Sequence, residues 1–256
     1  MGISAPERRE LLKTVYVQVR DCTRCPLHAT RTNAVFGAGN ADAELMFIGE
    51  APGANEDRLG LPFVGAAGKL LDRLLEEVGM DRSQVWIGNV LRCRPPDNRD
   101  PQPREIESCQ EYLFEQVRLI EPTVICTLGN FSTKLLRADT TGISRLHGRD
   151  EVRVIGSRAV RLYPLYHPAA ALYTPSMLET LRGDFSRIPD LLAQGPPPQP
   201  EPTDELPDLD ELYAPEEEVA EGRASAGAPR EPVGAAIGSA PGAAAADEPV
   251  SQLGLF

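Results

Sequence analysis

Short apolar runs typical of buried strands alternate with longer amphipathic runs typical of helices between residues 44 and 193. In the clearest helical run, 67–78, leucines recur every three or four residues and therefore share one helical face. Strands separated by helices are joined by right-handed crossovers, which produce a parallel sheet covered by helices. The sequence therefore predicts an α/β fold, a three-layer sandwich around a central four-stranded parallel sheet. The predicted strands are residues 44–49, 85–90, 123–128 and 160–166.

The composition of the chain changes abruptly at Gly195. From that residue onward the sequence is rich in proline, alanine and acidic residues, and it holds 11 of the 24 prolines. Such a segment cannot bury enough apolar surface to offset its ordering entropy. We therefore expect residues 1–194 to form the folded domain, residues 195–250 to form a disordered acidic linker, and the last six residues, 251–256, to have a separate role.

The net charge of the whole chain is −12, but most of it belongs to this acidic tail. Residues 1–194 are close to neutral, and two of their segments, 89–104 and 137–161, are rich in arginine. Such segments suit phosphate contacts, although a solvated arginine surface is an equally good interpretation of charge alone. The acidity of the whole chain therefore does not exclude a nucleic-acid partner.

No apolar run approaches the roughly 20 residues that a membrane-spanning helix needs. The first ten residues also lack the apolar stretch of a signal peptide, which predicts a cytoplasmic protein without membrane association. Disulfides are rare in that reducing compartment, so the five cysteines point instead to metal or redox chemistry.

Four of the five cysteines follow the spacing C-x2-C-x67-C-x15-C, as Cys22, Cys25, Cys93 and Cys109. Four thiolates suit either a zinc ion or an iron–sulfur cluster. Zinc ribbons usually contain two close pairs, whereas only Cys22 and Cys25 are close here, so the spacing favours iron–sulfur without excluding zinc. Cys126 lies inside an apolar strand-like run and is interpreted as a buried structural thiol.

Polar residues lie at the ends of three predicted strands. Glu50 follows the first strand, Asn89 lies at the end of the second, and His167 follows the fourth. Ligands of open parallel sheets bind beyond the carboxyl ends of the strands, where these side chains would converge. An acid, an amide and an imidazole can read a planar polar ligand and stabilise a developing anion. Singly, each could be a cap, a turn residue or a structural histidine, but together they predict a site.

Four motifs lie in the loops after these strands. They are Gly49-Glu-Ala-Pro-Gly53 with Glu56-Asp57, Pro62-Phe-Val-Gly65, Asn89 with Cys93-Arg-Pro-Pro96, and Tyr166-His-Pro168. Together with the cysteine spacing, they resemble the iron–sulfur uracil-DNA glycosylases of family 4 over roughly residues 15–193. The resemblance implies a [4Fe-4S] cluster on Cys22, Cys25, Cys93 and Cys109. It also implies removal of uracil from DNA that contains deaminated cytosine.

Breaking the bond between uracil and deoxyribose leaves negative charge on the base and positive charge on the sugar. We expect His167 to donate to the O2 edge of the base and Asn89 to pair with its O4 and N3–H. Phe63 would stack on the flipped base, while main-chain amides near Glu50 and Ala51 would hold its edge. The expected uracil-binding residues are Glu50, Ala51, Pro52, Phe63, Asn89 and His167. The expected catalytic residues are Glu50, Glu56 and His167.

The resemblance places Glu56 near C5 of the base, where bulk would exclude the methyl group of thymine. Ala51 departs from better-known members of the wider superfamily, which have at this position an aspartate that orients the attacking water. Glu50, Glu56, Asp57 or a loosely held water could take over that role, and the sequence leaves these alternatives open.

The alternative from a different functional class is a non-catalytic module. Such an iron–sulfur or zinc module would bind nucleic acid or assemble with a polymerase. It predicts binding without base release.

For the enzyme we expect a monomer that acts on uracil in single- and double-stranded DNA. Residues 145–149 and 169–177 would grip the strand, and Leu172 or Tyr173 would fill the gap left by the flipped base.

The acidic tail ends in an apolar cluster, Ser251-Gln-Leu-Gly-Leu-Phe256. This ending resembles the short peptide with which bacterial repair and replication proteins bind the DNA sliding clamp. The resemblance implies polar contacts from Gln252 and apolar contacts from Leu255 and Phe256, with Leu253 in the same peptide. An accidental match, or packing of the peptide on the domain, is the alternative.

Overall fold

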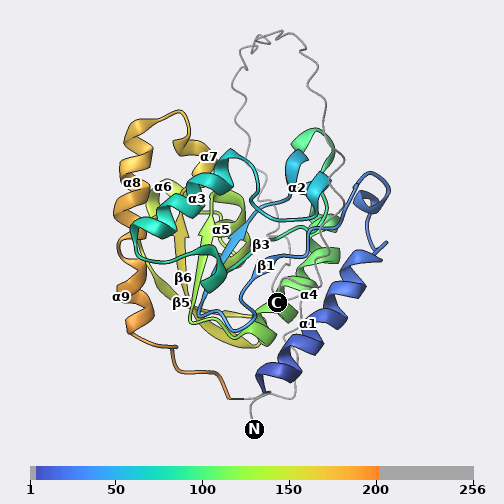
Figure 1. Ribbon diagram of the computed structural model, residues 1–256, viewed down its shortest axis with the longest axis horizontal. Helices are drawn as coiled ribbons and strands as arrows, with labels where there is room; N and C mark the ends of the chain where they lie inside the picture. Colours follow the sequence, from blue (N-terminus) through green and yellow to red (C-terminus); the bar gives the residue numbers. More distant parts are fainter. Residues whose placement is uncertain (1–3, 202–256) are drawn as a thin grey trace, which may run out of the picture.

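The computed structural model describes residues 4–201, and this part of the chain forms a six-stranded mixed sheet (Figure 1). The strands are β1 (Ala38–Gly39), β2 (Leu45–Gly49), β3 (Trp86–Asn89), β4 (Val124–Leu128), β5 (Glu151–Ile155) and β6 (Arg158–Leu165). Their order is β1-β3-β2-β4-β6-β5, in which β3, β2, β4 and β6 are parallel. At the two edges, β1 and β5 pair antiparallel with β3 and β6.

The α/β fold predicted from the sequence is confirmed, but the sheet of the described residues has six strands rather than four. The four predicted strands form its parallel centre. The two additional strands escaped prediction for different reasons. β1 contains only two residues, and β5 lies at an edge, where half-buried and exposed residues alternate without a continuous apolar run.

Helices connect the parallel strands and cover both faces of the sheet (Figure 1). They are α1 (Ala5–Arg20), α2 (Ala54–Leu59), α3 (Ala66–Glu77), α4 (Pro103–Ile120), α5 (Asn130–Arg137), α6 (Ile143–Leu146), α7 (Pro168–Ala171), α8 (Pro175–Phe185) and α9 (Ile188–Ala193). Three short 3₁₀ helices lie in loops: η1 (Pro26–Ala29), η2 (Arg82–Gln84) and η3 (Pro96–Asn98). Within residues 4–201, the helices are all too short or too polar to cross a membrane.

Two apolar cores lie on opposite faces of the sheet, because successive residues of a strand point to opposite sides. Met46 and Ile48 of β2 belong to the core under α1 and α4. Leu45 and Phe47 of the same strand belong to the core under α3, α8 and α9. The ring of Phe47 stacks on Phe185 of α8 with the ring centroids 5.7 Å apart. The layers are therefore helix, sheet and helix.

A buried carboxylate fixes the loop between β3 and α4. Glu105, in the first turn of α4, binds Arg99 through both oxygens at 2.6 and 2.9 Å. It also accepts a hydrogen bond from the backbone N–H of Gln102. The Arg99 guanidinium lowers the pKa of Glu105, which therefore stays ionised in its buried position. This pairing holds the helix that carries Cys109 against the segment that carries Cys93.

The chain stays in contact with the sheet beyond its last helix. The side-chain amide of Gln199 accepts from the backbone N–H of Ala159 at 3.1 Å and donates to its carbonyl oxygen at 2.9 Å. The side chain of Gln199 thus forms, with the backbone at the start of β6, the two hydrogen bonds that a neighbouring strand would form. The rest of the expected linker lies outside the described residues. So do the expected clamp-binding residues Gln252, Leu253, Leu255 and Phe256.

Candidate active site and cysteine cluster

The carboxyl ends of β2 and β3 lie side by side, because Gly49 pairs with Asn89 in the parallel ladder. Asn89 is buried, and its side-chain oxygen would lie 2.5 Å from a Cβ placed on Gly49. The same Cβ would lie 2.8 Å from the ring of Phe63. Gly49 therefore provides the space in which the amide of Asn89 and the ring of Phe63 meet at the end of the sheet.

His167 follows β6 and caps the first turn of α7. Its ring centroid lies 5.6 Å from that of Phe63, with an angle of 28° between the ring planes. Gly129, after β4, lets the backbone approach His167, since a Cβ there would lie 3.2 Å from Cβ of the histidine. The structure thus brings Phe63, Asn89 and His167 together at one edge of the sheet. Asn89 and His167 are two of the three residues that the strand ends predicted to converge, and Phe63 comes from the loop before α3.

The imidazole of His167 is neutral at neutral pH. Burial lowers its pKa to about 4, although Glu56 opposes this shift. The backbone N–H of Ala169 donates to Nδ1 of the ring at 3.1 Å. An accepting Nδ1 places the ring proton on Nε2. His167 therefore offers a neutral N–H donor, a form that can stabilise a developing anion without protonating it.

An uncommon backbone conformation holds Phe63 in place. Its φ is +53°, in the left-handed region that side chains other than glycine rarely adopt. Its carbonyl group faces Gly68 of α3, where a Cβ would lie 1.7 Å from the oxygen, so that only glycine fits. Arg82 of η2 donates to the carbonyl oxygens of Pro62 and Phe63. These backbone contacts determine where the ring of Phe63 lies.

Glu56 anchors the same loop. One of its carboxylate oxygens accepts from the backbone N–H groups of Val64 and Gly65 at 3.0 and 3.2 Å. These amides precede α3, and a carboxylate at a helix N-terminus satisfies donors that have no partner within the helix. Glu56 therefore supports the loop that carries Phe63, a contact that the sequence did not predict.

The three acidic candidates for orienting water lie in different surroundings. The buried carboxylate of Asp57 accepts from the backbone N–H groups of Thr32 and Asn33 at 2.9 and 3.4 Å. Asp57 therefore fastens a neighbouring loop instead of facing a ligand. Glu50 is half-buried, and its burial together with Asp100 raises its pKa. Glu50, directly after β2, and Glu56, in α2, remain as the acidic candidates.

Ala51 and Pro52 continue the turn after β2. Ala51 packs against the core under α1 and α4, and Pro52 is buried. The carbonyl oxygen of Glu50 accepts from the backbone N–H of Leu91 at 3.0 Å, which ties this turn to the segment after Asn89. Among residues 4–201, the side chain of Glu50 forms no hydrogen bond to the other expected site residues.

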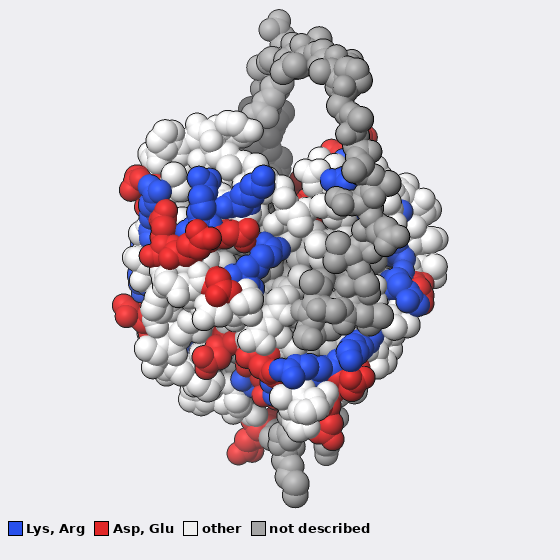
Figure 2. Space-filling model, in the orientation of Figure 1, with Lys and Arg blue, Asp and Glu red and all other residues white. Residues whose placement is uncertain are grey.

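Many arginines of the two basic segments are used within the protein. Arg99, Arg137 and Arg158, for example, pair with acidic residues. In the part of the chain that the structure describes, Arg104, Arg145 and Arg149 form no ion pair. On the face shown in Figure 2, basic and acidic side chains lie next to each other.

The two residues expected to fill the gap behind a flipped base differ in exposure. Tyr173, between α7 and α8, is 91% exposed. Leu172 is half-buried and packs against the core under α3 and α8. Tyr173 is therefore the residue of this pair that is available to an approaching strand.

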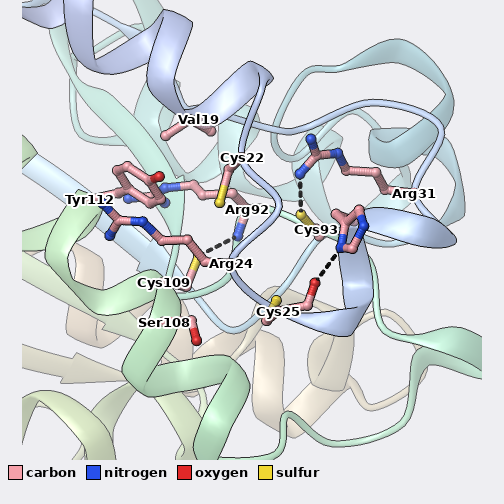
Figure 3. Close-up of a pocket in the computed structure, with 11 residues that line it drawn as sticks. Val19, Cys22, Arg24, Cys25, Arg31, Arg92, Cys93, Ser108, Cys109 and Tyr112 are labelled. Atoms are coloured by element: carbon pink, nitrogen blue, oxygen red, sulfur yellow. Dashed lines mark hydrogen bonds between the residues drawn. The ribbon is translucent and has the colours of Figure 1, made fainter.

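The four cysteines of the C-x2-C-x67-C-x15-C pattern line one pocket (Figure 3). Cys22 and Cys25 come from the loop after α1, Cys93 follows β3, and Cys109 belongs to α4. All four are free thiols. Cys126, by contrast, is fully buried in β4. The structure therefore gathers from three segments the four cysteines that the spacing singled out.

Hydrogen-bond donors surround these thiols. Arg31 donates to Sγ of Cys93 at 3.1 Å, and the backbone N–H of Arg92 donates to Sγ of Cys109 at 3.3 Å. Burial nevertheless raises the pKa of Cys25 and Cys93, and it raises the pKa of Cys109 to about 12. Ionising these three thiols therefore requires positive charge of the kind that metal ions supply.

The four thiols around one pocket are a donor set that metal ions accept. A zinc ion holds thiolates within about 4.6 Å of each other, since each Zn–S bond is about 2.3 Å long. Among residues 4–201, no three His, Cys, Asp or Glu side chains lie close enough to hold one metal ion. A four-iron cluster binds each thiolate through a different iron and so spaces the ligands more widely. The donor set, four thiols around one pocket, fits such a cluster.

Sequence reasoning missed the residues that position the site. Arg82 belongs to no motif, and Gly49 belongs to one but was given no role, because both act through contacts between distant segments. Sequence reasoning also gave no individual role to His147. In the structure its ring lies 4.5 Å from the ring of Tyr166, and its Nδ1 lies 2.9 Å from the carboxylate of Asp184. Arg92 did carry a signal, because it is a lone charge in the apolar run before Cys93.

A fold and a site of this kind are those of the uracil DNA glycosylase superfamily, whose family model matches residues 36–187. A type-4 uracil-DNA glycosylase of Archaeoglobus fulgidus is 46% identical over 193 residues, which cover 73% of this chain and 96% of that protein. The type-4 enzymes of Sulfurisphaera tokodaii and Saccharolobus solfataricus are 45% and 46% identical. Each alignment covers 70% of this chain, and 84% and 85% of those proteins. The chain belongs to the type-4 uracil-DNA glycosylases.

Proposed function

We propose that this protein removes uracil from DNA by hydrolysing the bond between the base and deoxyribose, which leaves an abasic site. One observation carries this proposal: the neutral imidazole of His167, the buried amide of Asn89 and the ring of Phe63 meet at the carboxyl ends of the parallel strands. The uracil that the enzyme removes comes from deaminated cytosine, so the reaction starts the repair of that lesion.

Asn89 distinguishes uracil from cytosine. A side-chain amide can donate to O4 and accept from N3–H of uracil at the same time. Cytosine presents the opposite pattern at both positions and would leave the buried amide unpaired. An unpaired buried polar group costs about 1–3 kcal/mol, which is sufficient to reject the amino pyrimidine. Phe63 adds a stacking surface for the flipped base.

His167 stabilises the departing base. Negative charge develops on the pyrimidine as the glycosidic bond breaks, and an N–H donor near O2 lowers the energy of that transition state. Glu50 is the acid that we assign to the attacking water, because Asp57 is bonded to backbone amides and Glu56 commits one oxygen to the start of α3. The raised pKa of Glu50 suits a proton acceptor.

Cys22, Cys25, Cys93 and Cys109 would hold a [4Fe-4S] cluster, an assignment supported by the four thiols around one pocket. When bound, the cluster supplies metal–thiolate bonds that join the loop after α1, the end of β3 and α4. Hydrolysis of a glycosidic bond requires no electron transfer. The role that we assign to these cysteines is therefore to fix the three segments relative to each other.

Arg104, Arg145 and Arg149 are our candidates for phosphate contacts in single- and double-stranded DNA, and Tyr173 is our candidate for filling the gap behind the flipped base. We further propose that residues 251–256 bind a DNA sliding clamp, and that the preceding acidic segment links this peptide to the domain. The protein would act as a monomer in the cytoplasm, beside the chromosome.

Incubation with a single-stranded oligonucleotide that contains one uracil, followed by alkali, tests the function directly. We expect cleavage at the uracil after alkali, and an intact strand when thymine or cytosine replaces the uracil. A non-catalytic binding module would shift the oligonucleotide in a gel without making it sensitive to alkali. That result would refute the enzymatic proposal.

A further inference from the structure

Arg92 lies between the cysteine pocket and the candidate uracil site. It is 1% exposed and lines the pocket together with the four cysteines (Figure 3). Its backbone N–H donates to Sγ of Cys109, and Cys93 is the next residue in the chain. One end of this short segment is therefore attached to the cysteine cluster.

The guanidinium of Arg92 binds the other end of the segment. Nη1 donates to the carbonyl oxygen of Asn89, and Nη2 donates to the side-chain oxygen of Gln116 at 2.6 Å. Gln116 in turn donates to the carbonyl oxygen of Phe36 at 2.8 Å. A buried chain of hydrogen bonds therefore holds the backbone of Asn89, whose side chain lies next to Phe63.

The charge of Arg92 has no carboxylate partner among residues 4–201. A buried cation without a counter-charge is costly, because desolvation is not offset by attraction. Its Nε also lies buried without a hydrogen-bond partner in this part of the chain. The cysteine pocket is the other polar surrounding of Arg92, since the side chain lines it together with Cys93 and Cys109. The position of the guanidinium therefore depends on how this pocket is filled.

We propose that Arg92 is a positioning residue that couples the cysteine cluster to recognition of uracil. This proposal rests on the proposed function, in which Asn89 reads the base. The cysteine pocket holds Arg92 through the bond from its backbone N–H to Sγ of Cys109, and the guanidinium fixes the carbonyl group of Asn89. The side chain of Asn89 starts from the backbone that carries this carbonyl group. Fixing the carbonyl therefore restricts the directions in which the side-chain amide can point. The cluster thereby contributes to base selection as well as to the stability of the domain.

Arg31 provides a matched control. Like Arg92 it donates to a cysteine, since Nη1 lies 3.1 Å from Sγ of Cys93. Its other contact, however, is the carbonyl oxygen of Arg20 at the end of α1, away from Asn89. Removing Arg31 therefore removes a positive charge beside the thiols without touching the hydrogen bond to Asn89.

The experiment compares holoprotein with the variants Arg92→Met, Arg92→Lys and Arg31→Met. Two oligonucleotides carry 2′-fluoro-deoxyuridine or 2′-fluoro-deoxycytidine, because the fluorine slows cleavage of the glycosidic bond. Fluorescence anisotropy gives the affinity of each protein for both oligonucleotides, and hence the ratio of affinities for uracil over cytosine. Iron content, visible absorbance and circular dichroism report whether each variant is loaded and folded.

We expect Arg92→Met to lower the ratio of affinities about tenfold and Arg31→Met to lower it less than threefold, at equal iron content. Arg92→Lys should be intermediate, because a single amine cannot bind both acceptors. In an Asn89→Ala background, Arg92→Met should have no further effect on the ratio.

An unchanged ratio in loaded, folded Arg92→Met protein would overturn the coupling, and so would equal losses in the Arg92→Met and Arg31→Met variants. If Arg92→Met does not fold or retain iron, the same criteria apply to Arg92→Lys. A wild-type protein that binds both oligonucleotides equally would instead refute the role of Asn89 in the proposed function.

Discussion

The ring of Phe63 lies against the ring of His167, with 5.6 Å between the centroids. Both rings occupy positions that glycines at the ends of neighbouring strands leave open. Gly49 makes room for Phe63, and Gly129 makes room for His167. The geometry of the site is therefore built into close approaches of the backbone, and adding a single Cβ there should displace the side chains of the site.

Gly49→Ala should lower uracil release by at least about 10²-fold, because the new Cβ would lie 2.5 Å from the side-chain oxygen of Asn89. Single-turnover rates on the uracil oligonucleotide measure this loss. Gly183→Ala in α8 is the matched control, since a Cβ there meets nothing within 4 Å. That control should keep full activity and gain about 0.5–1 kcal/mol of stability. Equal activity of the two variants would contradict the role of Gly49.

His167→Ala should reduce turnover by roughly 10²–10³, as expected when one donor to a developing anion is removed. Because the pKa of His167 is about 4, the wild-type rate should show no titration of this residue between about pH 5.5 and 8. A rate that rises with protonation of a group near pH 6.5, and loses that dependence in His167→Ala, would show that the charged imidazole is the active form.

Stability should depend on pH through the same residue. The folded protein has a His167 pKa of about 4 against an ordinary value of 6.5, so the unfolded chain takes up the proton first as pH falls. The free energy of unfolding should therefore decrease from about pH 6.5 towards pH 4 and be insensitive to this group above that range. Urea unfolding at pH 5 and pH 7.5 should show a smaller difference for His167→Asn than for wild type.

Asn89→Asp should weaken release of uracil and allow release of cytosine. A protonated carboxyl group can donate to N3 of cytosine while its other oxygen accepts from the amino group, which favours the amino pyrimidine. Burial at this position promotes the protonated form. Alkali cleavage of two matched oligonucleotides, one containing uracil and the other cytosine, measures the change in the two rates of base release. An unchanged ratio of the two rates would argue against the assignment of Asn89 to base recognition.

Cys109→Ala should bleach and destabilise the protein. We expect wild-type protein to be brown with broad absorbance in the visible blue, and to contain iron. Cys126→Ala is the control, because Cys126 is buried in β4 away from the pocket and should leave the colour unchanged. Colourless wild-type protein with stoichiometric zinc would contradict the cluster assignment.

Deletion of residues 252–256 should abolish binding to an immobilised sliding clamp and leave activity on short oligonucleotides intact. The affinity of the full chain should be micromolar in order of magnitude, as expected for a short peptide that becomes ordered on binding. A matched variant with Leu255 and Phe256 both changed to alanine should behave like the deletion. Equal clamp binding by full-length and shortened protein would defeat this proposal.

The sequence predicted the parallel centre of the fold and the residues at its strand ends, because both depend on local apolar runs. It predicted the cysteine set from spacing, and the structure gathers Cys22, Cys25, Cys93 and Cys109 around one pocket. Each of these features depends on the residues of a single segment or on spacing along the chain. They can therefore be predicted without knowing how the segments pack.

The contacts that orient the site could not be predicted in this way. The bond from Glu56 to the amides of Val64 and Gly65, and the bond from Arg82 to the carbonyl of Phe63, depend on how loops cross in space. Asp57 looked equivalent to Glu56 in the sequence, yet it faces a different loop. Such pairings have no periodicity and no fixed spacing.

The pairing of Gln199 with Ala159 holds the last described residues against the sheet. Ala159 lies at the start of β6, whereas His167 follows the end of that strand. Gln199 therefore lies at the end of β6 that is opposite the base-recognition site. The last described residues thus leave uncovered the strand ends at which Phe63, Asn89 and His167 meet.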